Sequence, residues 1–354
     1  MNVLIYKDNL STWRGADHLI CSIASSLAER GHEITIATSP GAFGSAFQVS
    51  DNVHKVEVAE VDVRALLAGF DCCLAAGPNE ICTLTERGTR RSPIPTIVSL
   101  LVSPNGFFKW RHPIRNWRIR RAFRLADILQ VQCHAYVSML NRIAPGVRIE
   151  PIAQWPDLSG VPFELAAGDR EKAIVYPAAM NRHKNQLLVI RAFALIADEF
   201  PEWQLHLYGK KNRRYGEKCL KVVRGLKAAS RIRFFDFTSS LSEVYSKASI
   251  LAFPSLMEGF PLTIVEAMSR SLPAVLVEDL PAAHEMVRHA ETGWVAPATV
   301  EGYANALREL MRDEELRVRL GQSARRDCES RFVKDRIIDR WEVLLQELSS
   351  QKVG

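Results

Sequence analysis

Short apolar runs alternate with stretches of helical periodicity along almost the whole chain. Near the start, Val3–Tyr6 is apolar throughout, and Glu33–Thr38 forms a second run of the same kind. Between them, apolar residues recur at helical spacing in Ala16–Arg30, and Gly31 follows at a C-cap position. A strand, a helix and a second strand in this order form a βαβ unit with parallel strands. The alternation therefore predicts an α/β fold built on open parallel sheets.

The same alternation predicts the remaining elements of two successive sheets. In the first half we expect three further strands and three helices at Asp71–Ala76, Asn79–Gly88, Pro95–Leu101, Pro113–Leu125, Asp127–Gln132 and His134–Ile143. In the second half we expect one helix and six strands at Asn185–Phe200, Lys172–Tyr176, Trp203–Tyr208, Arg231–Phe235, Ser249–Phe253, Pro273–Val277 and Trp294–Ala296. The segment Ser239–Glu243 has a capping-box pattern, which predicts a further short helix. Three helical segments follow Thr299 without a strand between them.

The stretch Pro151–Gly168 interrupts this order, because it contains three Pro and two Gly and has the composition of a linker. The length of 354 residues agrees with two domains of roughly 150 residues each. We therefore expect one Rossmann-like domain over residues 1–165 and a second over residues 166–331. Ligands of such sheets bind beyond the carboxyl ends of the strands, so two facing sheets would form a cleft between the domains.

Composition excludes several classes of protein. Apolar residues make up 47% and charged residues 24%, which is typical of globular proteins and excludes fibrous and disordered chains. The chain has neither a run of roughly 18 apolar residues nor a basic and then apolar N-terminus, so we expect no membrane span and no secretory signal. The seven Cys form no CxxC pair, which favours a reducing cytosol without disulfides or structural zinc. A net charge of +6 suits an anionic partner.

The most informative segment runs from Phe253 to Met268 and predicts a strand, a turn and a helix. Pro261 suits the first helical turn, where its missing N–H costs no hydrogen bond. The backbone N–H groups of the turn would lie at the N-terminus of the helix, which is a site suited to a diphosphate. The residues of this expected donor site are Gly259, Phe260, Pro261, Leu262 and Thr263.

Two glutamates accompany this turn. Glu258 lies in the turn and Glu266 lies about one turn into the helix. An ionised carboxylate only accepts hydrogen bonds, so each could bind hydroxyls, those of a sugar at Glu258 and those of a ribose at Glu266. The alternative is that both glutamates are surface residues on a solvated face.

This segment resembles the E-x7-E signature of glycosyltransferase family 4, which contains retaining enzymes of the GT-B fold. Glu258 and Glu266 match the two glutamates, with Glu-Gly-Phe-Pro-Leu and Glu-Ala-Met in the family's places, and later motifs match over the rest of the chain. The family often has Gly where this chain has Ser271. The resemblance implies that Glu258 contacts the transferred sugar, that Glu266 contacts the nucleoside ribose, and that the backbone after Glu258 holds the donor diphosphate.

The resemblance also implies how the reaction proceeds. In the family's front-face mechanism the leaving phosphate deprotonates the acceptor hydroxyl, so stabilisation of that phosphate is the main catalytic contribution. Lys184 matches the family lysine, and Arg182 replaces an arginine that would fall near Ala179. The alternative for both cations is an exposed position near a helix N-terminus, and we expect His183 to be exposed and passive. The C-terminal helix over residues 332–354 is expected to pack back on the first domain.

The first half resembles the family more faintly. Gly15, at the start of a helix, takes the place of a glycine-rich loop and could bring the backbone close to the donor phosphate or the acceptor; the alternative is a loop without a ligand. Many members have a His after the strand at Pro95–Leu101, whereas this chain has none there. Its polar contact would have to come from Ser103 or Asn105.

A basic, aromatic stretch runs from Phe107 to Arg124 without an acidic residue. Such a composition suits an interface with anionic lipid. We expect the membrane or acceptor side to include Lys109, Trp110, Arg115, Trp117, Arg118 and Arg121. The alternative is a solvated helix with Trp117 and Phe123 packed inward, and no nucleic-acid-binding module surrounds the stretch.

The residues and the resemblance together predict a retaining glycosyltransferase that acts without a metal, since the chain contains no Asp-x-Asp. Its donor would be a nucleotide-diphosphate sugar, with no other cofactor. Its acceptor would be a glycan or lipid-linked glycan of envelope or exopolysaccharide biosynthesis, and its location the cytoplasm, at the inner face of the membrane. The alternatives are a non-catalytic nucleotide-sugar or glycan-binding subunit, and an epimerase or phosphorylase of the same fold.

Overall fold

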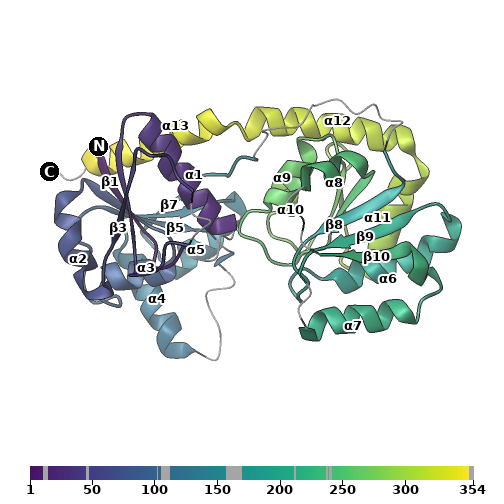
Figure 1. Cartoon of the computed structure of the whole chain (residues 1–354), viewed down its shortest axis with the longest axis horizontal. Coiled ribbons are helices and arrows are strands. Elements are labelled where there is room, and N and C mark those ends of the chain that lie inside the picture. The colour runs from purple at the N-terminus through teal and green to yellow at the C-terminus, as the bar shows by residue number, and fades with distance from the viewer. Residues whose placement is uncertain are drawn as a thin grey trace. The chain divides into compact units, whose positions relative to one another are not determined.

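The computed structural model divides the chain into two compact units. Unit 1 comprises Met1–Gln154 together with Lys334–Gly354, and unit 2 comprises Trp155–Val333. Each unit contains one parallel sheet with helices beside it (Figure 1). The structure describes residues 1–10, 15–44, 48–101, 103–104, 112–156, 170–210, 213–236, 238 and 241–350.

The sheet of unit 1 has seven parallel strands in the order β3-β2-β1-β4-β5-β6-β7. The strands are β1 (Asn2–Tyr6), β2 (Glu33–Thr38), β3 (Val53–Glu57), β4 (Cys72–Ala75), β5 (Thr96–Leu100), β6 (Ile128–Val131) and β7 (Arg148–Pro151). The order runs outward from β1 to β3 on one side and from β4 to β7 on the other. The topological switch point therefore lies between β1 and β4, where ligands of open α/β sheets bind.

The helices of unit 1 connect these strands, except for the last, which follows unit 2 in the sequence. They are α1 (Gly15–Glu29), α2 (Val63–Leu66), α3 (Pro78–Leu84), α4 (Pro113–Leu125), α5 (Val137–Ile143) and α13 (Lys334–Ser350), with short 3-10 helices such as η1 (Glu60–Asp62). Gly31 follows α1 with a φ of +88°, which confirms its predicted place at the end of this helix. The helix α3 is shorter than expected, because it ends at Leu84 and three residues with positive φ follow.

The last helix, α13, is part of unit 1 and packs against α1 and β4 (Figure 1). Its inner face is apolar, and Trp341, Leu344 and Leu345 on this face are buried. Ion pairs reinforce the contact, because Arg30 at the end of α1 lies 2.5 Å from both Asp339 and Glu342. The helix therefore completes the core of unit 1 although it is far from β1 in the sequence.

An ion pair crosses the switch point of unit 1. Lys7 follows β1, Glu80 lies in α3 after β4, and Lys7 Nζ is 2.7 Å from Glu80 Oε1. The Glu80 side chain is 3% exposed and that of Lys7 is 21% exposed. Burial raises the pKa of Glu80, and the Lys7 ammonium opposes this rise. The pair holds together the segments that follow the two central strands.

Replacing Lys7 with methionine (K7M) is expected to lower the free energy of unfolding by about 2 kcal/mol near neutral pH, because the buried Glu80 carboxylate loses a hydrogen-bond donor. A carboxyl with a raised pKa in the folded state gains stability as the pH falls through that pKa. Without Lys7 the pKa of Glu80 rises further, so the deficit of K7M should shrink between about pH 7.5 and about pH 5. Urea denaturation of wild type and K7M measures the difference between their free energies of unfolding. The same difference at both pH values would contradict this role of the pair.

The sheet of unit 2 has six parallel strands in the order β10-β9-β8-β11-β12-β13. The strands are β8 (Ala173–Pro177), β9 (Gln204–Tyr208), β10 (Ile232–Phe235), β11 (Ile250–Phe253), β12 (Ala274–Val277) and β13 (Trp294–Ala296). The helices are α6 (Gln186–Ile196), α7 (Arg213–Arg224), α8 (Leu241–Lys247), α9 (Leu262–Met268), α10 (Ala283–Met286), α11 (Val300–Arg312) and α12 (Glu314–Arg331). The switch point of this sheet lies between β8 and β11.

Ser271 explains one departure from the family pattern. Its N–H donates to the Met268 carbonyl, and the Leu272 N–H donates to the Ala267 carbonyl, each over 3.0 Å. These two bonds form a Schellman motif at the end of α9, and Ser271 takes its left-handed position with a φ of +53°. Glycine is the residue that this left-handed position favours, so Ser271 occupies it at a cost in free energy.

Sequence patterns did not predict five of the strands and α-helices. These are the edge strands β3 and β7 of unit 1 and the helices α2, α7 and α10. Arg213 and Arg214 form the start of α7. Within the described residues, no helix is long and apolar enough to cross a bilayer.

Candidate active site

The switch point of unit 2 brings Lys184 and Glu258 together. Lys184 lies in the loop after β8, and Glu258 lies in the loop after β11. These strands are adjacent and parallel, with Leu251 opposite Val175, so their carboxyl ends meet at one edge of the sheet. Lys184 Nζ is 2.5 Å from Glu258 Oε1. The fold therefore brings into direct contact two charged groups that are 74 residues apart in the sequence.

Ser255 contacts both the Glu258 carboxylate and the loop that contains Lys184. Its hydroxyl is 2.6 Å from Glu258 Oε1 and 3.3 Å from the His183 carbonyl. The Leu256 N–H also donates to the His183 carbonyl, over 2.8 Å. The loops after β8 and β11 are thus joined through backbone as well as side chains, which limits how far Glu258 can move from Lys184.

The loop of Lys184 has its own supports. The Asn181 side-chain oxygen accepts hydrogen bonds from the N–H groups of His183 and Lys184, over 3.0 and 3.1 Å. The buried Tyr176 hydroxyl donates to the Lys184 carbonyl over 2.7 Å. Burial raises the pKa of Tyr176, and the negative charge of Glu258 raises it further, so the hydroxyl stays a donor at neutral pH.

Glu266 lies in the second turn of α9 and faces α8. The Tyr245 hydroxyl donates a hydrogen bond of 3.0 Å to Glu266 Oε2. Burial and the Glu266 carboxylate both raise the pKa of Tyr245, which keeps this hydroxyl protonated. The bond orients the carboxylate that the resemblance assigns to a ribose.

The turn between the two glutamates differs from the expectation in one respect. Pro261 has φ −82° and ψ 71°, and the Leu262 N–H donates to the Phe260 carbonyl over 2.9 Å. This is an inverse γ-turn, and α9 begins only at Leu262. The Leu262 N–H is therefore occupied and Pro261 has none, so these two residues do not offer a phosphate the amides that the turn was expected to supply. Phe260 is buried against Phe332, with ring centroids 5.7 Å apart, and Thr263 lies in the first turn of α9.

Arg182 lies in the same loop as Lys184, and Gly15 belongs to unit 1. Arg182 is exposed, and its charge acts on the Tyr215 hydroxyl of α7. Within the described residues, its side chain forms no hydrogen bond or ion pair. Gly15 begins α1 in unit 1.

Ser103 in unit 1 is buried, and its hydroxyl has no partner among the described residues. Asn105 lies outside the described residues.

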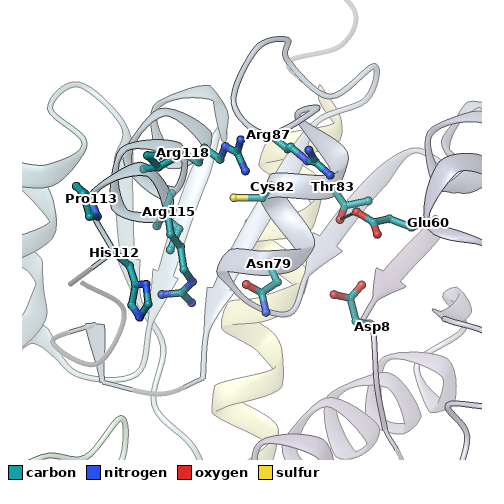
Figure 2. Close-up of a pocket in the computed structure, with 12 residues that line it drawn as sticks. Asp8, Glu60, Asn79, Cys82, Thr83, Arg87, His112, Pro113, Arg115 and Arg118 are labelled. Carbon is teal, nitrogen blue, oxygen red and sulfur yellow. Dashed lines mark hydrogen bonds between the residues drawn. The ribbon is translucent and has the colours of Figure 1, made fainter. Parts of the chain in front are cut away.

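The expected membrane or acceptor residues fall on α4, except for Lys109 and Trp110, which lie outside the described residues. Trp117 is 53% exposed, with the Arg121 guanidinium 4.9 Å from its ring centroid, whereas Phe123 is buried. The inward packing of both aromatics, the alternative interpretation, is therefore wrong for Trp117. Arg115 and Arg118 line a cavity of unit 1 (Figure 2).

No group of three His, Cys, Asp or Glu side chains in the described ranges is placed to hold a metal ion. Sequence reasoning also missed Ser255, Asn181 and Tyr245, which support the three charged residues. Only Ser255 had a signal in the sequence, since it precedes Glu258 by three residues at the end of a strand. The other two act through contacts that no local pattern encodes.

Comparison with known proteins matches part of the chain to a family model. Residues 161–327 match the model of the family described as Glycosyl transferases group 1. The matched part contains the loops of Lys184 and Glu258 and the helix of Glu266.

The chain matches a small part of one relative and nearly all of another. An exopolysaccharide phosphotransferase of Streptomyces coelicolor is 30% identical over 205 residues, which are 56% of this chain and 21% of that protein. The N-acetyl-alpha-D-glucosaminyl L-malate synthase of Bacillus anthracis is 23% identical over 366 residues, which cover 92% of each. The chain thus spans about a fifth of the first relative's length and most of the second's.

A solved structure shows the same fold. HepE of Anabaena, in complex with UDP, has a TM-score of 0.79 at 16% identity, over 98% of this chain and 100% of that one. The two parallel-sheet units and this likeness confirm the expected GT-B fold.

Proposed function

We propose that this chain, whose residues 161–327 match the model of the group 1 glycosyl transferases, catalyses a reaction of that class. As a glycosyltransferase, it moves a sugar from a nucleotide-diphosphate sugar to a glycan or lipid-linked glycan. The observation that supports this most directly is the Lys184–Glu258 pair at the switch point of unit 2, within an E-x7-E segment.

In this proposal Lys184 and Glu258 act on the two halves of the donor. An ammonium has three N–H donors, so Lys184 can retain Glu258 and still bind a phosphate oxygen of the donor. Glu258 accepts hydrogen bonds from the transferred sugar, and Glu266, oriented by Tyr245, accepts them from the ribose. The backbone from Gly259 to Thr263 lies between these two contacts, and Arg182 adds positive charge in the loop of Lys184.

The reaction proceeds with retention and without a metal. The acceptor hydroxyl oxygen bonds to the anomeric carbon of the sugar, the bond from that carbon to the leaving phosphate breaks, and the acceptor's proton passes to the leaving phosphate oxygen. Negative charge grows on the phosphate during this step. A nearby ammonium that is already in place stabilises that charge without reorganising, which is the usual source of catalysis by electrostatics.

The acceptor belongs to envelope or exopolysaccharide biosynthesis in this proposal, and the protein works in the cytoplasm at the inner face of the membrane. The name of one relative, an exopolysaccharide phosphotransferase, supports the first part. The exposed apolar and basic face of α4 supports the second.

Sugar release by the purified protein tests the proposal. UDP-, GDP- and ADP-sugars are incubated with the protein, and release of the nucleoside diphosphate and the anomeric configuration of the product are measured, with and without a chelator. We expect slow hydrolysis or transfer with one of the three nucleotides, a retained configuration, and no effect of the chelator. Binding without turnover of any donor would favour a non-catalytic subunit instead.

Removing the two exposed apolar residues of α4 is expected to weaken binding to anionic vesicles at least about tenfold, because both would insert at the lipid interface. Ile114 is 67% exposed and Trp117 53%. The variant I114S/W117S is compared with wild type by flotation with phosphatidylglycerol vesicles. The matched control is L195S/V343S, since Leu195 and Val343 are 55% and 53% exposed on other helices. Equal loss in both variants, or none in either, would refute membrane contact through α4.

A further inference from the structure

Unit 1 contains a cavity of about 620 Å³ at the switch point of its own sheet (Figure 2). Its lining comes from segments that follow the carboxyl ends of four strands. Asp8 follows β1, Glu60 follows β3, Asn79 and Thr83 follow β4 in α3, and α4 follows β5. This volume and position are typical of small-molecule sites in α/β proteins.

Arginines and carboxylates line this cavity. Arg118 comes from α4, while Asp8 and Glu60 lie across the cavity from α4 (Figure 2). Arg87 comes from the turn after α3 and lies on the side of Thr83 and Glu60. In the described part of the chain, neither Arg87 nor Arg118 forms a side-chain hydrogen bond or an ion pair. Burial raises the pKa of Cys82, between them, to about 11, against the opposing charges of Arg115 and Arg118. Arg87 and Arg118 thus offer the cavity two guanidinium groups without acidic partners among the described residues.

The backbone around Arg87 is strained. Glu86, Arg87 and Gly88 have φ values of +47°, +59° and +84° in succession, a region that non-glycine residues rarely adopt. Gly88 fits closely against α4, because a Cβ at this position would lie 2.7 Å from Arg121 Cβ. The Glu86 carboxylate pairs with Arg64 over 3.2 Å. Such strain persists only where surrounding structure enforces it, and it gathers at functional sites.

One buried hydroxyl lies near Asp8 and Thr83, two residues that line the cavity. The Tyr6 side chain at the end of β1 is fully buried, and its hydroxyl has no hydrogen-bond partner among the described residues. Burial raises the pKa of Tyr6, and the Asp8 carboxylate raises it further, which places the hydroxyl near a residue that lines the cavity. A buried hydroxyl without a partner costs free energy unless a ligand or a water binds it.

We propose that this cavity binds the negatively charged group of a saccharide acceptor, a phosphate or a carboxylate, between Arg87 and Arg118. The arginines form charge-assisted hydrogen bonds to the anionic group. Asp8, Asn79 and Glu60 accept hydrogen bonds from the hydroxyls of the same sugar. The proposal rests on the function proposed above, since it names the substrate class that the transferase accepts.

Binding of simple sugars to the whole chain tests the proposal. Glucose 6-phosphate, glucuronate and neutral glucose are titrated by calorimetry in the presence of a saturating nucleoside diphosphate, which occupies the donor site. Wild type should bind both anionic sugars at least tenfold more tightly than glucose. The variant R87Q/R118Q should lose this preference. Each tenfold loss of affinity corresponds to about 1.4 kcal/mol of binding free energy. Equal binding of glucose and the anionic sugars by wild type would overturn the proposal.

Matched variants separate charge from folding. Arg142 and Arg191 are exposed on α5 and α6, outside the cavity, so R142Q/R191Q removes the same net charge and should keep the preference. The single variant R118Q changes α4 alone and should lose most of it without altering the strained turn. Nucleotide affinity and thermal unfolding verify that each variant is folded. A preference that survives in R87Q/R118Q and in R118Q would overturn the proposal.

Two further outcomes separate the ligand's source and the underlying function. Phosphatidylglycerol vesicles that bind through Arg87 and Arg118, while the sugars do not, would identify a lipid contact and refute the acceptor site. Transfer to neutral acceptors alone, with no binding of anionic sugars, would refute this inference and leave the proposed function intact. Binding of anionic sugars by a protein that hydrolyses and transfers no donor would contradict the proposed function, and with it the acceptor assignment.

Discussion

Transfer activity is expected to fall between a hundredfold and a thousandfold, about 2.7–4 kcal/mol, when Glu258 is replaced by alanine (E258A), on the scale of removing one group that stabilises a transition state. In the structure the Glu258 carboxylate accepts hydrogen bonds from Lys184 and Ser255. Without it, the donor sugar loses an acceptor for its hydroxyls, and the Lys184 ammonium loses the group that fixes its position. The measurement is kcat/KM for sugar transfer or donor hydrolysis.

A double-mutant cycle shows whether the pair acts as a unit. K184A should cause a loss of similar size, and E258A/K184A should lose little more than either single variant, because residues that act together are not additive. The control is E315A, which removes an exposed glutamate of α12 and should leave activity unchanged. Activity of E258A within a few fold of wild type would remove the central support for the assigned site.

Unit 2 is expected to lose about 3 kcal/mol of stability when Gly321 is replaced by alanine (G321A), because the new methyl group has no space. A Cβ at Gly321 in α12 would lie only 2.0 Å from the Ser271 carbonyl oxygen. That oxygen belongs to the backbone of the Schellman motif that ends α9, so no flexible side chain can move aside. For a unit of this size the expected drop in Tm is about 6–12 °C.

The matched control for this substitution is G225A in the same unit. A Cβ at Gly225 would meet the Val222 carbonyl at 3.6 Å, an ordinary contact, so its stability should change by no more than about 0.5 kcal/mol. Thermal unfolding followed by circular dichroism compares both variants with wild type. If G321A and G225A have the same Tm, then α12 can shift away from α9 and the close contact does not contribute to stability.

The sequence predicted the central strands of both sheets because parallel strands covered on both faces are continuous apolar runs. It did not predict β3 and β7, which form the two edges of the sheet of unit 1. Edge strands have one open side, and both are mostly exposed or half-buried, with residues such as His54, Lys55 and Glu150. Such strands lack the apolar run on which the prediction depends.

Local motifs identified the charged residues of the candidate site but not their supports. Glu258, Glu266 and Lys184 lie in segments whose spacing is recognisable in the sequence. The Tyr245–Glu266 bond joins residues 21 positions apart on two helices, and no periodicity encodes it. The cavity of unit 1 was missed because four separate segments form it. Its one local signal was Arg87 followed by Gly88 at the end of an expected helix.

The contribution of α13 to unit 1 affects how the protein is synthesised. Residues 334–350 cover part of α1 and β4, so this unit lacks a piece of its core until that segment has left the ribosome. Unit 2, whose residues all precede it, can fold first as a nascent chain, although domains more often fold in the order of synthesis. A premature stop codon near residue 333 would therefore damage the half of the molecule encoded at the start of the gene.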